Sequence, residues 1–156
     1  MDALLRLETL FPGDRLSRRN FHHLLTRGHA DLLVYERRGE IVGDAVLLYR
    51  RGQSGARLYS LIVHPDQRGR GIGRALIQAA ERAARAHRCT ELRLEVRVGN
   101  KSAQRLYRRL GYLPAGRIED FYEDHAPALR FRKRLNSTLK TQREDAKARR
   151  IADHIF

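Results

Sequence analysis

The chain has 156 residues, the size of one domain, and a domain of this length buries roughly two-thirds of the surface that its unfolded chain exposes. Its 32 Lys and Arg residues outnumber its 18 Asp and Glu residues, and the net charge of +14 favours nucleic acid, ribosomal surfaces, acidic peptides or phosphorylated cofactors as partners. The single cysteine excludes an intramolecular disulfide, and the lack of a basic leader or of about 18 consecutive apolar residues predicts a cytoplasmic protein that does not enter the membrane.

The first part of the chain is predicted to form two helices, an antiparallel hairpin and a third strand. Apolar residues recur on one face of each helix, Pro12-Gly13 stops the first helix, and Gly28 stops the second. Pro65 ends the third strand because proline cannot donate to a sheet ladder. The predicted elements are helices at 4–10 and 17–28 and strands at 32–35, 41–49 and 57–63.

The second part of the chain continues with alternating helices and strands. A helical pattern of apolar residues begins at Gly71, so a strand-to-helix junction falls on a cluster of glycines. Residues 91–98 alternate apolar and charged side chains with the two-residue period of a strand. The predicted elements are helices at 71–87 and 100–110 and strands at 91–98, 121–122 and 128–135.

The composition changes at Asn136, where a polar, charge-mixed tail without glycine or proline begins. A weak helical stripe runs through this tail at Ala148, Ile151, Ala152 and Ile155. We therefore expect a single globular domain over residues 1–135 and a basic, helical C-terminal extension over residues 136–156.

The glycine-rich segment at 68–73 has the features of a phosphate-binding turn. At a helix N-terminus, backbone N–H groups without a partner and the positive end of the helix dipole attract an anion, and glycines let the anion approach closely. Arginines at 68, 70 and 74 add positive charge. The segment lacks the Gly-Lys-Ser/Thr of nucleotide P-loops and the G-x-G-x-x-G spacing of dinucleotide folds, which argues against both. The spacing alone is also compatible with a plain structural turn.

Three blocks of sequence resemble the GNAT family of N-acetyltransferases. The first, Arg68-x-x-Gly71-x-Gly73 preceded by Val63-x-Pro65, resembles the acetyl-CoA motif of that family. The second, LEVRVGNKSAQRLYRRLGY at 94–112, looks like the family's next conserved block. The third, FYEDHAPALRFRKRL at 121–135, resembles the closing strands of the branch typified by the ribosomal-protein alanine N-acetyltransferases.

The resemblance implies an α/β (α+β) fold with a mixed, mostly antiparallel sheet flanked by helices, whose splayed central strands hold acetyl-CoA between them. In the family, the third strand binds the pantetheine arm and the acetyl group, and the glycine loop wraps the pyrophosphate. No metal is implied. The residues that the resemblance assigns to the cofactor are Leu61, Ile62, Val63, Arg68, Gly69, Arg70, Gly71, Ile72, Gly73, Arg74, Asn100 and Tyr107.

Glu95 and Tyr107 are the candidate catalytic residues. An N-terminal amine has a pKa near 7.7–8.0, so a modest base suffices, and Glu95 matches the base proposed for the family, acting directly or through water. Tyr107 matches a tyrosine beside the thioester sulfur, and its phenol carries the proton that a departing thiolate needs. Each residue also has a structural interpretation, Glu95 as a cross-strand partner of an arginine and Tyr107 as a packed residue of its helix.

The start of the chain departs from the resemblance. Most relatives open with a strand before the first helix, whereas this sequence begins almost inside that helix, so we expect the family's first strand to be absent. Without it, one edge of the strand at 32–35 is bare, and bare edges promote association. We expect either the extension at 136–156 or a second subunit of a homodimer to cover this edge.

These observations predict an N-acetyltransferase that moves an acetyl group from acetyl-CoA to a primary amine by direct attack in a ternary complex. The expected acceptor is the N-terminal amine of a protein or peptide. One alternative is a small amine or a lysine side chain as acceptor. The other is a non-catalytic CoA-binding module that docks on RNA, ribosomes or an acidic partner through its basic surface.

Overall fold

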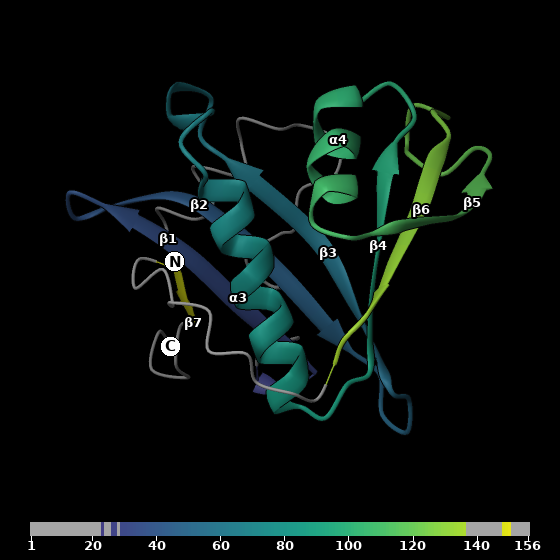
Figure 1. The fold of residues 1–156 in the computed structure, drawn as a ribbon, viewed down its shortest axis with the longest axis horizontal. Coiled ribbons are helices and arrows are strands. Elements are labelled where there is room, and N and C mark those ends of the chain that lie inside the picture. The colour runs from purple at the N-terminus through teal and green to yellow at the C-terminus, as the bar shows by residue number, and fades with distance from the viewer. Residues whose placement is uncertain (1–22, 24–25, 28, 137–147, 151–156) are drawn as a thin grey trace.

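The computed structural model describes residues 23, 26–27, 29–136 and 148–150 of the chain. Its elements are β1 (Ala30–Arg37), β2 (Glu40–Tyr49), β3 (Gly55–Val63), the 3-10 turn η1 (Pro65–Gln67), α3 (Ile72–Ala86), β4 (Glu91–Arg97), α4 (Lys101–Arg109), β5 (Leu113–Ile118), β6 (Ala128–Arg134) and β7 (Ala148–Arg150). The strands form one sheet in the order β5-β6-β4-β3-β2-β1-β7, and α3 and α4 lie on the same face of it (Figure 1).

The sheet is mixed and mostly antiparallel, as predicted. Only the central neighbours β3 and β4 are parallel, and every other pair of neighbouring strands is antiparallel. The two helices predicted before β1 fall almost entirely outside the described residues, as does any strand that precedes them. Among the residues that the structure describes, no helix is long and apolar enough to cross a membrane.

The core lies between α3 and strands β1 to β4. The apolar residues of α3 recur every three or four positions, and Leu76, Ile77 and Ala80 on that face are fully enclosed. At Gly43 of β2, the sheet approaches the helix so closely that a Cβ atom would lie 3.0 Å from Cγ2 of Ile72. A larger residue at Gly43 would therefore push the N-terminal end of α3 away from the centre of the sheet.

The sheet opens between β3 and β4. Their parallel ladder ends at the pair Leu58 and Leu94, whereas β3 stays paired with β2, and β4 with β6, over the rest of their lengths. Tyr59 is an extra residue in the register of β3 with β2, and such a bulge bends its strand. Figure 1 shows β3 and β4 close at one end and apart at the other, with α4 near the open end. This is the splay that the family resemblance implied.

The edge strand β5 has no counterpart among the predicted elements. It pairs with β6, whereas the strand predicted at 121–122 is wrong, because those residues lie in the connection between β5 and β6. β5 contains Pro114 and Gly116, which disfavour strands, and a bulge falls between them. An edge tolerates both residues, because one side of the strand needs no ladder hydrogen bonds.

The C-terminal extension supplies the strand at the other edge. Residues 148–150 form β7, which pairs antiparallel with residues 33–35 of β1, and Ala148 is buried. The predicted helix is therefore wrong at these three residues, and the rest of the extension lies outside the described residues. The expectation that the extension covers the edge of β1 is confirmed. A strand forms here because the edge of β1 offers backbone hydrogen bonds that a helix cannot use.

Ending the chain at Asn136 is expected to expose the edge of β1 and to lower thermal stability. This truncation removes the β7 ladder and the buried Ala148 but keeps the carbonyl of Asn136, which accepts a hydrogen bond from Arg85. We expect Tm to fall by several degrees and two molecules to pair through the bare edge, as measured by thermal unfolding and analytical ultracentrifugation. A truncated protein that stays monomeric with an unchanged Tm contradicts this role of the extension.

Candidate active site

A cleft of about 1600 Å³ lies where β3 and β4 diverge. Its walls come from the separated ends of these two strands, the loop before α3, the helix α4 and the connection from β5 to β6. Of the residues predicted to bind the cofactor or act in catalysis, only Arg70, which is exposed, lies outside the lining. The cleft brings together Leu61, Ile62, Val63, Arg68, Gly69, Gly71, Ile72, Gly73, Arg74, Glu95, Asn100 and Tyr107.

The glycine loop at 68–73 presents an uncapped helix N-terminus to this cleft. Gly69 and Gly71 both have a φ of 76°, a left-handed conformation that costs other residues roughly 1–2 kcal/mol. Gly71 is the N-cap of α3, and the first hydrogen bond of the helix joins the Ala75 N–H to the Gly71 carbonyl. The amides of residues 72–74 precede that bond and carry the positive end of the helix dipole. They form a surface that suits an anion such as a pyrophosphate.

Gly73 lets α4 pack directly on the first turn of α3. A Cβ atom at this position would lie 3.2 Å from Cδ2 of Leu106, so any larger residue would push the two helices apart. α4 begins after Asn100, whose side-chain Oδ1 accepts a hydrogen bond from the Ala103 N–H. Asn100 is thus the N-cap of α4 as well as a lining residue of the cleft. The cap fixes the direction of α4, and with it the place of Tyr107 two turns later.

Leu61, Ile62 and Val63 form the β3 edge of the cleft. They pair with β2 on one side, and beyond Leu58 no ladder joins β3 to β4 on the other side. Backbone N–H and C=O groups that a neighbouring strand would otherwise engage are therefore available to an extended ligand. This edge can hold an amide-containing arm by main-chain hydrogen bonds.

Tyr107 both packs in the core and lines the cleft. Its ring contacts those of Tyr112 and Phe131, with centroids 6.0 Å and 6.2 Å away. No residue in the described part of the chain forms a hydrogen bond with its hydroxyl group. Burial, and to a smaller extent the neighbouring phenol of Tyr122, raise the pKa of Tyr107 above its usual range. The hydroxyl therefore keeps its proton at neutral pH, and the packed and proton-donating interpretations are compatible.

Glu95 is enclosed between two arginines. Its side chain is only 5% exposed, and both carboxylate oxygens are engaged. The Nε of Arg57 donates to Oε2 at 2.9 Å, and an Nη of Arg130 donates to Oε1 at 3.3 Å. The predicted cross-strand partnership with arginine is therefore present. The two guanidinium groups compete with a substrate amine for the oxygens of Glu95.

Arg97, which sequence reasoning did not assign to the site, shapes the wall near Glu95 together with Tyr122 and Asp124 of the β5–β6 connection. Arg97 donates to the Asp124 carboxylate at 2.8 Å, and its guanidinium carbon lies 4.1 Å from the centre of the Tyr122 ring. The hydrogen bond from Arg97 lowers the pKa of Asp124, so the pair stays ionised at neutral pH. These contacts tie the β5–β6 connection to β4. In the sequence, the only pattern that could have assigned Arg97 to the site is the alternation of β4, which puts Arg97 on the same face as Glu95.

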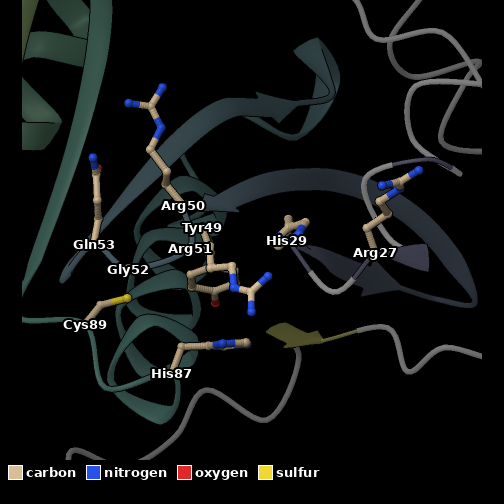
Figure 2. A pocket seen from close by; sticks show the side chains of 9 residues that line it. All are labelled: Arg27, His29, Tyr49, Arg50, Arg51, Gly52, Gln53, His87 and Cys89. Atoms are coloured by element: carbon tan, nitrogen blue, oxygen red, sulfur yellow. The ribbon is translucent and has the colours of Figure 1, made fainter.

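A second cavity, of about 510 Å³, lies near the C-terminal end of α3 and the turn between β2 and β3 (Figure 2). Arg27, Arg50 and Arg51 line it, but Figure 2 shows that their guanidinium groups point in different directions and do not converge on one ligand position. Burial raises the pKa of the Cys89 thiol on its wall, which makes this thiol a poor nucleophile. Among the described residues, no three His, Cys, Asp or Glu side chains could hold a metal ion.

Comparison with known proteins relates the chain to acetyltransferases. Residues 1–112 match the sequence model of the Acetyltransferase (GNAT) family. A "putative ribosomal protein bS18-alanine N-acetyltransferase" of Bacillus subtilis (strain 168) is 30% identical over 105 residues, which cover 67% of this chain and 68% of that protein. The crystal structure of a ribosomal-protein-alanine N-acetyltransferase from Brucella melitensis superposes with a TM-score of 0.67 at 27% identity, over 77% of this chain and 80% of that one. A chain of the NatC complex bound to Gag peptide and CoA has a TM-score of 0.74 at 21% identity, over 86% and 90% of the two chains, which shows the shared fold.

Proposed function

This chain belongs to the Acetyltransferase (GNAT) family, and we propose that it transfers the acetyl group of acetyl-CoA to the N-terminal amine of a protein or peptide. One observation carries the proposal: the glycine loop before α3, the free edge of β3, Glu95 and Tyr107 line a single cleft. A phosphate site, an edge for an extended arm, a carboxylate and a protonated phenol are the groups that this reaction uses.

The cofactor would be held by backbone groups more than by side chains. The amides of residues 72–74 would bind the pyrophosphate, and Arg68, Arg70 and Arg74 would add positive charge around it. The β3 edge at 61–63 would bind the pantetheine arm. Acetyl-CoA supplies the acetyl group as a thioester, and the residues of this chain supply orientation and proton transfer.

The proposed chemistry assigns one proton transfer to each candidate catalytic residue. Glu95 accepts the proton of the incoming amine, directly or through water. Backbone N–H groups of residues 61–63 stabilise the oxyanion that forms when the amine attacks the thioester. Tyr107 donates its proton to the departing thiolate. The transfer is direct, because Cys89, the only cysteine, lies in the other cavity.

Three of the related proteins support a protein N-terminus as the acceptor. The Bacillus and Brucella proteins are both named as ribosomal-protein alanine N-acetyltransferases, and the NatC structure contains a peptide. An N-terminal amine also needs less help from a base than a lysine does, since its pKa is near 7.7–8.0 rather than about 10.4. The net charge of +14 on this chain favours a ribosomal or other acidic partner.

Thiol release measured at saturating acetyl-CoA tests the proposal. Peptides that begin with alanine, serine or methionine form one panel, and polyamines and peptides with a blocked N-terminus but a free lysine form the other. We expect the free N-terminal peptides to accelerate thiol release. Release only with polyamines or lysine would assign the acceptor to the second class. If no amine accelerates release while RNA binds with a steep salt dependence, the chain is a binding module instead.

Replacing Glu95 by Gln is expected to lower kcat for an N-terminal peptide about tenfold at pH 8, a modest loss for a catalytic base because much of the amine is already unprotonated there. Glu91→Gln is the matched control. Glu91 lies on the same face of β4 and pairs more loosely with an arginine, at 3.8 Å from Arg132. We expect this control to keep its kcat. A Glu95→Gln variant that loses thermal stability but keeps full kcat would leave Glu95 with the ion-pairing role alone.

A further inference from the structure

Three arginines lie side by side across the central strands on the face opposite α3. Arg57 of β3 and Arg93 of β4 are register partners, and so are Arg93 and Arg132 of β6. Leu92, Leu94 and Val96 of β4 are buried with the core, so the alternate residues of that strand point to the other face. We call Arg57, Arg93 and Arg132 the arginine row. It leads directly to Glu95 and the cleft, because Arg57 donates to Glu95 and lines the cleft itself.

The arginine row carries more positive charge than its neighbours neutralise. Like charges directly opposite each other in a sheet are unfavourable, and this row sets them opposite each other twice. Glu95 pairs with Arg57 and also with Arg130, and Glu91 reaches Arg132 only at 3.8 Å with that arginine 67% exposed. Among the residues that the structure describes, no carboxylate lies within ion-pair distance of Arg93. Five arginines on this part of the face, Arg57, Arg93, Arg130, Arg132 and Arg134, thus share the carboxylates of Glu91 and Glu95.

The shortage of carboxylates falls where the amine acceptor must lie. Arg57 and Arg130 occupy three of the four lone-pair positions of the Glu95 carboxylate, two on Oε1 and one on Oε2, so an amine must compete with both arginines for these oxygens. A carboxylate on the acceptor would supply the missing negative charge. It would pair with the arginine row and so draw Arg57 away from Glu95. A neutral or basic acceptor would leave Glu95 held by both arginines.

We propose that the acceptor is an acidic peptide, one whose N-terminal amine is followed by Asp or Glu side chains that pair with the arginine row. This inference rests on the proposed function and names the substrate class of the same cleft. Arg57, Arg93 and Arg132 determine specificity, and pairing with Arg57 also frees Glu95 to act as the base. A strand-like peptide fits the row, because the three arginines span two strand-to-strand spacings of about 4.8 Å.

A nucleic acid fits the arginine row less well. Phosphate backbones are bound by long positive tracks, and each charge of such a track contributes to the salt dependence of binding. Here the row is interrupted on β4 by the carboxylates of Glu91 and Glu95, which lie on either side of Arg93 and would repel a phosphate chain. A peptide has room to place one or two carboxylates between them.

Matched peptides test the proposal. Thiol release with the full chain is measured for peptides that begin Ala-Glu-Glu, Ala-Gln-Gln and Ala-Lys-Lys and are otherwise identical. We expect kcat/KM for the acidic peptide to exceed that for the amide peptide about tenfold, as two partly exposed ion pairs allow, and the basic peptide to be slowest. The advantage should shrink as salt is raised. Equal rates for the acidic and amide peptides overturn this inference but leave the proposed function standing, whereas no release with any peptide removes both.

The double variant Arg93→Gln/Arg132→Gln shows whether the arginine row is responsible. We expect it to bring the acidic and amide peptides within about twofold of each other, chiefly by slowing the acidic peptide. Arg50→Gln/Arg51→Gln is the control, since it removes the same charge from exposed positions at the far end of the sheet and should keep the preference. If both double variants lose the preference for the acidic peptide equally, that preference is an effect of the net charge of the protein and not of the arginine row. Loss of RNA binding in the first variant, with peptide rates unchanged, would assign the row to nucleic acid.

Discussion

Glutamate in place of Gly71 is expected to abolish acetyl-CoA binding, with Kd rising at least about a hundredfold, equivalent to about 2.7 kcal/mol. Gly71 is the N-cap of α3, and the amides that would bind the pyrophosphate follow it directly. A glutamate side chain would place a carboxylate beside these amides, where it would both occupy them and repel the phosphates. Isothermal titration with acetyl-CoA measures the loss.

Gly52→Glu is the control that separates this effect from backbone strain. Gly52 has a φ of 75° against 76° for Gly71, and a Cβ atom at either position would meet no atom within 4 Å. The two substitutions therefore impose the same left-handed strain and the same change of charge, but Gly52 lies in the turn between β2 and β3, at the far cavity. We expect equal losses of Tm and a loss of affinity only at Gly71. Unchanged affinity in Gly71→Glu would overturn the assignment of the loop.

Most of the fold could be predicted because its signals are local. The helical period after Gly71 and the alternation at 91–98 each report burial of one face, and the structure places α3 and β4 there. The same is true of the hairpin at 32–49, whose apolar strands are buried in the core. The splay between β3 and β4 was predicted from the family resemblance alone, since no period in the sequence marks the bulge at Tyr59, where the β3–β4 ladder ends.

The parts that sequence reasoning missed depend on contacts between distant residues. β5 is exposed along almost its whole length, so no alternation of burial marks it. β7 forms because the edge of β1 is available more than a hundred residues earlier in the chain, and three residues of a weak helical stripe adopt the strand instead. For Glu95, a cross-strand arginine was expected, but the enclosure by both Arg57 and Arg130 appears only when three strands are aligned.

That enclosure changes what Glu95 implies about the substrate. A carboxylate that faces open solvent could serve as a base for any amine, whereas one held at both oxygens serves best when the substrate itself displaces an arginine. The cleft therefore separates two tasks. In the proposed reaction, the glycine loop and the β3 edge would select the donor through backbone groups, and the charges around Glu95 would select the acceptor through side chains.

Phenylalanine in place of Tyr107 is expected to lower kcat about a hundredfold while the Kd for acetyl-CoA changes less than twofold. General acid catalysis contributes about 10²–10⁴ in rate, and the lower end applies because a thiolate leaves more readily than an alkoxide. The ring contacts with Tyr112 and Phe131 remain in the variant. Since no described residue bonds to the Tyr107 hydroxyl, its removal should leave Tm unchanged. Single-turnover kinetics and thermal unfolding measure the two quantities.

Tyr112→Phe is the converse experiment on a neighbouring phenol. The Tyr112 hydroxyl is buried outside the cleft and donates to Glu81, which also accepts a hydrogen bond from Lys133 at 2.6 Å. Its removal should cost about 1–2 kcal/mol of folding free energy but leave kcat within about twofold. If Tyr107→Phe instead lowers Tm and keeps its turnover, the phenol of Tyr107 acts only in packing. The thiolate must then leave unprotonated or take its proton from water.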